Sequence, residues 1–185
     1  MSKLGELKEI LKKLIAIPSV TGNEHDIAIY IADYLRQCGV DSVELQPVEG
    51  KRLNVVAHLK GEKVGPVVLL TGHMDTVAPG EGWRTDPFKA TERDGRIYGR
   101  GAADMKGGIA AILVAIRNAA AQREQMRGEA IIAFVCDEEA YSKGVDALIR
   151  SGIRADYGIA AEPEWDAVIG AVGKMLIKVR VYGIA

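Results

Sequence analysis

The sequence predicts an α/β fold in which a mostly parallel mixed sheet is flanked by helices. Two apolar runs, residues 66–72 (PVVLLTG) and 129–136 (EAIIAFVC), have the length and the β-branched content of buried strands. Between them, residues 105–121 form an Ala- and Ile-rich stretch that is long enough for a buried helix. Strands that alternate with helices favour parallel pairing, because each helix can cross over between neighbouring strands.

The chain begins with two predicted helices. Apolar residues recur at helical spacing through residues 3–16, at Leu4, Leu7, Ile10, Leu11, Leu14 and Ile15. A second helix is predicted to run to about Cys38. Thr21 and Glu24 match a capping box for this helix, with Thr21 as the N-cap residue and Glu24 at position N3.

The remaining elements follow from alternation and turn residues. A strand is predicted at residues 53–59, and residues 78–100 predict a long loop with a short β segment near Arg96–Tyr98. Residues 145–152 predict a short helix and residues 157–163 a short strand. Residues 174–185 alternate apolar and charged side chains, which is typical of a strand with one wet face. That strand lacks an evident partner, so we expect it to allow self-association of the chain.

Bulk properties exclude several classes of protein. The 185 residues include 24 Lys+Arg and 25 Asp+Glu, so the net charge of −1 predicts neither a nucleic-acid nor another polyanionic partner. No apolar stretch approaches the roughly 20 residues of a membrane span, and the amphipathic N-terminus does not resemble a signal peptide. Cys38 and Cys136 lack metal-ligand spacing and are expected to be reduced thiols in a cytoplasmic protein.

Acidic and imidazole side chains gather where predicted strands end or the buried helix begins. Six residues share this placement: His73, Asp75, Asp104, Glu138, Glu139 and Glu162. Ligands of α/β proteins usually bind beyond the carboxyl ends of the strands. We therefore expect the six side chains to form one site.

Each of these residues has a simpler explanation when it is taken alone. His73 would be a hydrogen-bonded structural histidine, Asp104 a helix N-cap, and Glu162, before Pro163, part of a turn. Residues 137–144 would be a solvated loop. These separate explanations do not account for the six residues as a group, because clustered carboxylates repel one another unless a cation neutralises them. His with Asp and Glu suits Zn²⁺, and also Mn²⁺ or Co²⁺.

The spacing within the cluster suggests separate roles. Residues i and i+2 of an extended segment point the same way, so Asp75 is placed to reach the far nitrogen of His73 and fix its tautomer. Where the chain turns after residue 136, one of Glu138 and Glu139 can bind metal while the other faces a metal-activated water.

A dinucleotide site is an alternative interpretation of residues 99–108 (GRGAADMKGG), which begin with a G-x-G pattern. The third glycine of that fingerprint is replaced by Asp104, whose charge would repel a pyrophosphate at the helix N-terminus. A titration with NAD(H), followed by fluorescence, would decide this alternative.

Four motifs in order resemble a family of metal-dependent exopeptidases and amidohydrolases. GHMDTV, GRGAADMKGG, CDEE and AEP occur in the order found in acetylornithine deacetylase, succinyl-diaminopimelate desuccinylase and glutamate carboxypeptidases. The resemblance implies a zinc-exopeptidase-like catalytic domain, interrupted by a lid domain that often dimerises. It also implies hydrolysis of an amide bond in an N-acyl amino acid or small peptide by a metal-activated water.

The resemblance implies a role for each residue of the cluster. His73 and Glu162 bind one zinc, Glu139 binds a second, and Asp104 bridges both. Asp75 orients His73, and Glu138 is the general base. The peptide bond after the bridging aspartate, here Asp104–Met105, is often cis in the family.

The sequence departs from the family pattern in one respect. The family takes its last metal ligand from a histidine beyond the lid, but the histidines here are His25, His58 and His73. We therefore expect residues 1–172 to be the N-terminal part of the catalytic domain and residues 173–185 to be the first strand of an otherwise absent lid. A complete enzyme would hold two zinc ions, and this chain one. The alternative function is a catalytically incompetent metal-binding fragment or interaction module.

Overall fold

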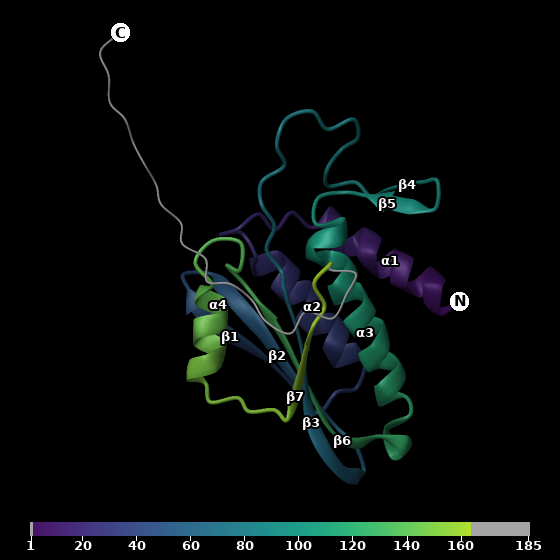
Figure 1. The fold of residues 1–185 in the computed structure, drawn as a ribbon, viewed down its shortest axis with the longest axis vertical. Coiled ribbons are helices and arrows are strands. Elements are labelled where there is room, and N and C mark those ends of the chain that lie inside the picture. Colours follow the sequence, from purple (N-terminus) through teal and green to yellow (C-terminus); the bar gives the residue numbers. More distant parts are fainter. Residues whose placement is uncertain (1, 164–185) are drawn as a thin grey trace.

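The computed structural model describes residues 2–163 of the protein. Figure 1 shows a sheet with helices on both faces, which is the α/β architecture expected from the sequence. The predicted strand at residues 174–185 and the predicted boundary between residues 172 and 173 lie outside the described residues.

The sheet has five strands in the order β1-β2-β6-β3-β7. Their bounds are β1 (Ser42–Glu49), β2 (Arg52–Lys60), β3 (Lys63–His73), β6 (Arg127–Val135) and β7 (Tyr157–Ala160). β3 is parallel to both β6 and β7, whereas β2 is antiparallel to both β1 and β6. The mixed sheet is thus confirmed. All its strands except β2 point the same way, although β2 makes the pairings on either side of it antiparallel.

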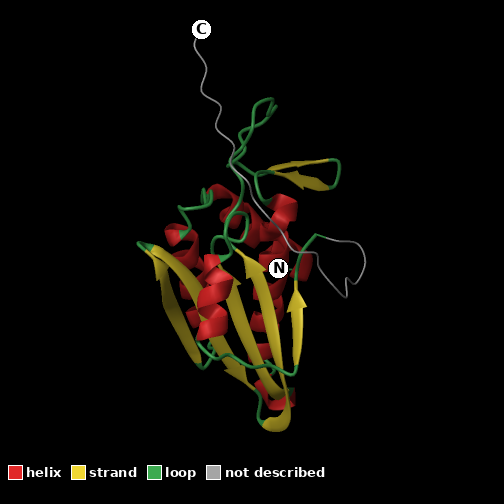
Figure 2. Cartoon of the chain, turned by 60° about the vertical axis from the view of Figure 1, so that its left-hand side comes forward, coloured by secondary structure: helices red, strands yellow, loops and turns green. Residues whose placement is uncertain are grey.

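Two apolar layers cover the faces of the sheet. The larger layer packs α1 (Lys3–Ala16), α2 (His25–Gln37) and α3 (Gly107–Ala120) on one face, and the smaller packs α4 (Lys143–Arg150) on the other (Figure 2). Alternate residues of β6 point to opposite faces of the sheet. Ile132 and Phe134 pack in the larger layer, and Ile131 and Ala133 pack in the smaller layer. Burial of β6 on both faces explains its unbroken apolar sequence.

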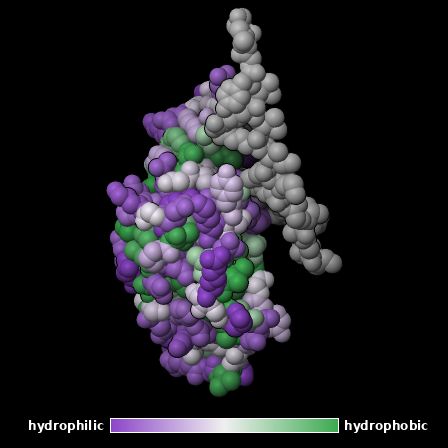
Figure 3. Space-filling model, turned by 90° about the vertical axis from the view of Figure 1, so that its left-hand side faces the viewer, coloured by the Kyte–Doolittle hydropathy of each residue, from purple (hydrophilic) through white to green (hydrophobic). Residues whose placement is uncertain are grey.

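Most predicted elements are present with shifted ends. The strand predicted at residues 66–72 begins earlier, at Lys63, and the one predicted at residues 157–163 ends earlier, at Ala160. β1 was not predicted. Its Pro47 lies at an irregularity in the register with β2, and none of its residues is fully buried, so its apolar signal is weak. Figure 3 shows a face on which apolar residues are scattered among hydrophilic ones, as on ordinary solvated surfaces.

The predicted capping box of α2 is wrong. Glu24, which directly precedes the helix, makes no side-chain cap; its carboxylate is fully buried and pairs with Arg52. The Thr21 hydroxyl instead donates to Asp75 at 2.9 Å. A buried carboxylate is stable only when a cation or several hydrogen-bond donors surround it. Glu24 therefore pairs with Arg52, and Thr21 donates to Asp75, instead of the two residues capping the helix.

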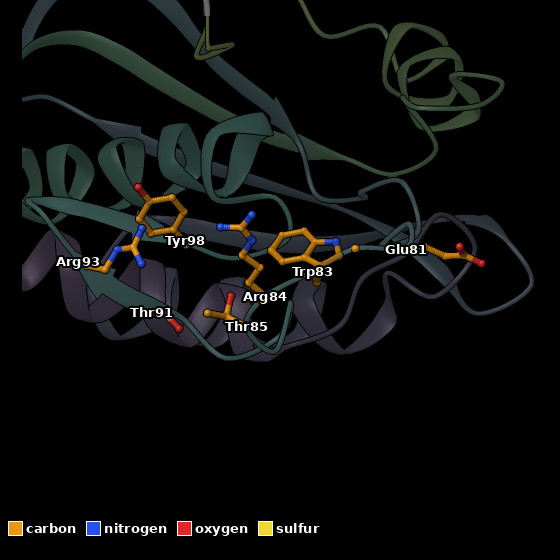
Figure 4. A pocket seen from close by; sticks show the side chains of 8 residues that line it. Glu81, Trp83, Arg84, Thr85, Thr91, Arg93 and Tyr98 are labelled. Carbon is orange, nitrogen blue, oxygen red and sulfur yellow. The ribbon is translucent and has the colours of Figure 1, made fainter.

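Residues 74–101 rise above the sheet as a long loop, which carries the hairpin of β4 (Thr91–Arg93) and β5 (Arg96–Tyr98). This confirms the predicted loop and its short β segment. A cavity of about 430 Å³ lies along it, lined by Glu81, Gly82, Trp83, Arg84, Thr85, Thr91, Arg93 and Tyr98 (Figure 4). The lining contains none of the six clustered residues, so this cavity is separate from the site described next.

Candidate metal centre

Parallel pairing brings the predicted site residues together. His73 ends β3 and pairs in register with Val135, the last residue of β6. Glu138 and Glu139 therefore follow β6 at the same edge, and Glu162 follows β7, which flanks β3 on its other side. Asp104 enters from the turn η1 (Ala102–Lys106), directly before α3. The sheet edge thus collects side chains from four separate segments of the chain.

His73 is at the centre of the cluster, and its side chain is only 2% exposed. Its Nε2 lies 2.9 Å from Asp104 Oδ1, 3.8 Å from Glu162 Oε2 and 4.0 Å from Glu138 Oε2. Ligand atoms of His73, Asp104 and Glu139 all lie within 4.8 Å of one another, a spacing that can hold one metal ion.

Asp75 contacts His73 through its main chain. His73 Nδ1 lies 2.8 Å from the Asp75 carbonyl oxygen, while the Asp75 carboxylate is 3.7 Å away. The hydrogen bond is therefore made by the backbone and not by the side chain that the spacing suggested. A carbonyl only accepts, so Nδ1 carries a proton. Nε2 faces the carboxylates, where a proton on it is shared with Asp104 and a metal ion can replace that proton.

The Asp75 carboxylate holds the two glutamates instead. It is fully buried and accepts hydrogen bonds from the amides of Glu138 (3.0 Å) and Glu139 (3.1 Å), as well as from the Thr21 hydroxyl. These donors satisfy a buried charge and fix the backbone that carries Glu138 and Glu139. Thr21 was assigned to a helix cap by its sequence neighbours, and no local pattern indicated this contact.

Electrostatics within the cluster favour a cation. Burial raises the pKa of Glu139, and the carboxylate of Asp104 raises it further. Burial lowers the pKa of His73, but the carboxylates of Glu162 and Asp75 raise it, and the net pKa lies above the ordinary value for histidine. The raised pKa values of Glu139 and His73 both mean that the cluster favours added positive charge, here a proton. A divalent cation would supply that charge in place of a proton.

The donor set fits such a cation. One imidazole nitrogen and several carboxylate oxygens are ligands that suit Zn²⁺, Mn²⁺ or Co²⁺. The acidic side chains remain open to solvent: 54% of Asp104, 40% of Glu138 and 34% of Glu162 are exposed. The imidazole is thus buried, while the carboxylates around it are accessible from solvent.

Asp104 is held by its neighbours in η1. The Asp104–Met105 peptide bond is cis, as the resemblance implied. Met105 is buried, and its sulfur accepts a hydrogen bond from the His73 amide at 3.0 Å. Lys106 is also buried, and its Nζ donates to the carbonyl oxygens of Leu14 and Ile17, at 2.9 Å each. Sequence reasoning did not single out Lys106, because nothing in its local pattern distinguishes it from a surface lysine.

The two remaining histidines lie elsewhere. His25 begins α2 and is paired with Asp26, while His58 lies on β2 and is paired with Glu129. Neither contributes a ligand atom to the group formed by His73, Asp104 and Glu139. Among the described residues the cluster thus has one imidazole, as the order of the motifs predicted.

A mixed sheet that gathers one histidine and several carboxylates at its strand ends is the arrangement of a metal-binding α/β domain. The sequence profile of Peptidase family M20/M25/M40 matches residues 69–180, more than half of the chain. The protein belongs to this family.

Individual relatives agree with this assignment. Succinyl-diaminopimelate desuccinylase of Bordetella avium is 38% identical over 173 residues, which cover 90% of this chain and 45% of that protein. Among solved structures, human carnosine dipeptidase 1 has a TM-score of 0.73 at 25% identity and covers 84% of this chain and 38% of its own. An M20 family metallo-carboxypeptidase from Sulfolobus solfataricus has a TM-score of 0.74 at 25% identity, covering 84% and 37%. The chain spans less than half the length of these relatives.

No helix within residues 2–163 combines the length and the apolar character that crossing a membrane requires.

Proposed function

We propose that this chain forms the metal-binding part of a hydrolase that cleaves an amide bond in an N-acyl amino acid or small peptide. The observation that carries the proposal is the convergence of His73 Nε2, Asp104 and Glu139 within metal-binding distance at the edge of the sheet. The family assignment supports amide hydrolysis as the type of reaction.

Each residue of the cluster has a proposed part. His73, Asp104 and Glu162 would hold one ion, and Asp104 and Glu139 a second, with Zn²⁺ the first candidate and Co²⁺ or Mn²⁺ the alternatives. Bound metal supplies a Lewis acid that polarises the scissile carbonyl and acidifies water. The Glu138 side chain is 40% exposed and lies outside the group of three metal-ligand atoms. As the general base, it would take a proton from water and pass it to the leaving nitrogen.

The substrate class rests on the relatives. One is named a desuccinylase, another a dipeptidase and a third a carboxypeptidase, and each of these reactions breaks an amide bond next to a small acid or amino acid. We propose the same class for this chain, with the acyl group and amino acid to be identified by assay.

A second candidate function is metal binding without catalysis. The observation that favours it is that the cluster has one imidazole among the described residues. Under this alternative the chain binds about one ion tightly and turns over N-acyl amino acids very slowly.

Metal analysis and an activity assay separate the two functions. The hydrolase predicts two bound ions and release of amine from N-succinyl or N-acetyl amino acids or from dipeptides. The non-catalytic alternative predicts about one tightly bound zinc per chain after dialysis and very slow release of amine. Glu138→Gln should keep the metal content and abolish any turnover, because the amide cannot accept the proton. Unchanged turnover in Glu138→Gln would exclude Glu138 as the base. Two tight ions with fast turnover would exclude the non-catalytic alternative.

A further inference from the structure

Arg52 belongs to a buried charge network directly behind the two glutamates of the cluster. Its Nε donates to Glu24 Oε2 at 3.0 Å, and its Nη2 donates to Asp137 Oδ1 at 2.8 Å. The side chain of Arg52 is 12% exposed, and those of Glu24 and Asp137 are 0% and 1% exposed. Charges buried to this degree are strongly destabilising without partners, so each member of the network depends on the others.

The register of the sheet explains why an arginine at this position reaches the site. β2 and β6 are antiparallel, with Val55 opposite Phe134. The strand pairing ends there, and three residues beyond it on each chain segment the Arg52 side chain contacts Asp137. The beginning of β2 is thus adjacent to the end of β6, where the chain turns toward Glu138.

Asp137 fixes both ends of the loop that follows β6. Its other carboxylate oxygen accepts from the Lys143 amide at 3.1 Å, and its carbonyl accepts from the Ser142 amide at 2.7 Å. Its backbone is left-handed, with φ of 69°, which reverses the chain at this point. The loop that carries Glu138 and Glu139 is therefore held at its base by Asp137.

Asp75 holds the same loop just after Asp137, because its carboxylate accepts hydrogen bonds from the amides of Glu138 and Glu139. Two buried aspartates, one with an arginine partner and one with neutral donors, set its conformation. Arg52 itself pairs with Glu24, Asp137 and Glu49, none of which belongs to the six clustered residues. Its direct contact with the loop that carries Glu138 and Glu139 is the one to Asp137.

We propose that Arg52 is a positioning residue that, through Asp137, fixes the direction in which Glu138 and Glu139 leave β6. The consequence for metal binding rests on the proposed function, since it requires Glu139 to be a ligand. The placement of the loop does not rest on it. Residues that orient metal ligands typically change metal affinity about 10- to 100-fold when they are replaced.

A matched pair of variants tests the proposal. Arg52→Met removes the cation from Glu24 and Asp137. Arg117→Met removes a cation from Glu6, whose side chain is 6% exposed, at a place with no contact to Asp137. Both leave a buried glutamate without its arginine, so both lower stability. Only Arg52→Met should disturb the loop.

Two measurements are compared in the wild type and both variants. The first is hydrogen exchange of the Glu138 and Glu139 amides in metal-free protein, relative to the amide of Ile132 in the middle of β6. The second is zinc affinity by competition with a chelator. We expect Arg52→Met to speed exchange selectively at the two amides and to weaken zinc binding about 10- to 100-fold. Arg117→Met should leave the relative exchange and the zinc affinity unchanged.

The proposal is overturned if a folded Arg52→Met variant exchanges the two amides and binds zinc as the wild type does. It is also overturned if Arg117→Met speeds the exchange and weakens zinc binding as much as Arg52→Met does. If Arg52→Met does not fold, Asp137→Gly replaces it, because glycine keeps the left-handed backbone while removing the carboxylate. The same results then apply. If the wild type binds no zinc, the proposed metal site is wrong, and the exchange of the two amides alone decides the role of Arg52.

Discussion

At His73, a single backbone hydrogen bond selects which ring nitrogen is available for chemistry. The Asp75 carbonyl accepts a hydrogen bond from Nδ1–H, so Nε2 faces the carboxylates of Asp104 and Glu162. The sequence placed these residues together but assigned the contact to the wrong part of Asp75. Side-chain direction after the strand end depends on the local turn, and the i, i+2 rule holds only for extended backbone.

Metal affinity should depend on pH through His73. Its pKa is raised because the carboxylates of Glu162 and Asp75 outweigh the opposing effect of burial. A proton and a cation compete for Nε2, so zinc affinity should fall about tenfold per pH unit once pH is below that pKa. Chelator competition between pH 5.5 and 8 measures the slope. A flat profile would show that His73 does not bind the ion.

Lys106 predicts an alkaline gain in stability. Burial lowers the pKa of Lys106 to about 8, from an ordinary 10.5. Between these values the unfolded chain binds the proton and the folded chain does not, so the free energy of unfolding rises with pH, by up to about 3 kcal/mol. Cys136 acts in the opposite sense above pH 9, because burial raises the pKa of its thiol to about 12.

Comparison with Lys106→Met isolates this contribution, since Cys136 is common to both proteins. Urea unfolding at pH 7, 8 and 9, in the presence of a metal chelator, gives the two stability curves. The free energy of unfolding of the wild type should rise relative to that of the variant as pH rises above about 8. Parallel curves would mean that Lys106 is not buried as a titrating amine.

At the scale of elements, the site depends on how α3 approaches the end of β7. Gly108 lies in the first turn of α3, and a Cβ added there would lie 2.1 Å from the Ala161 carbonyl oxygen. Glu162 follows directly. The sequence indicated the helix and the strand, and Gly108 counted as an unfavourable residue within that helix. The close approach between the two explains why glycine is needed.

Gly108→Ala should therefore weaken metal binding by displacing residues 161–162. We expect a loss of about 1–3 kcal/mol in stability from the overpacking, together with a measurable fall in zinc affinity. Ala111→Gly, at an exposed position of the same helix, is the control: it costs about 1 kcal/mol in helix propensity and should leave zinc affinity unchanged. Denaturant unfolding and chelator competition on both variants provide the comparison. Equal zinc affinities would contradict the link between α3 and Glu162.

At the scale of the whole molecule, four segments converge on one edge of the sheet, and their carboxylates repel one another there. A bound cation removes this repulsion only in the folded state. Zinc at about 100 times its Kd should therefore stabilise the chain by about 2.7 kcal/mol. Thermal unfolding with zinc, and again after chelation, measures the shift. His73→Ala should show no zinc-dependent shift, whereas the same shift in that variant would place the ion elsewhere.

The sequence by itself determined the α/β class, the order of most helices and strands, and the six residues of the cluster. It could do so because burial on both faces leaves long apolar runs, and because parallel strands end at one edge. Tertiary structure decided the rest. The antiparallel insertion of β2 between β1 and β6 brings Arg52 to Asp137, and the turn after β3 directs the Asp75 carboxylate to Glu138 and Glu139. These contacts join residues more than 60 positions apart, so no local pattern encodes them; only the register of the folded sheet does.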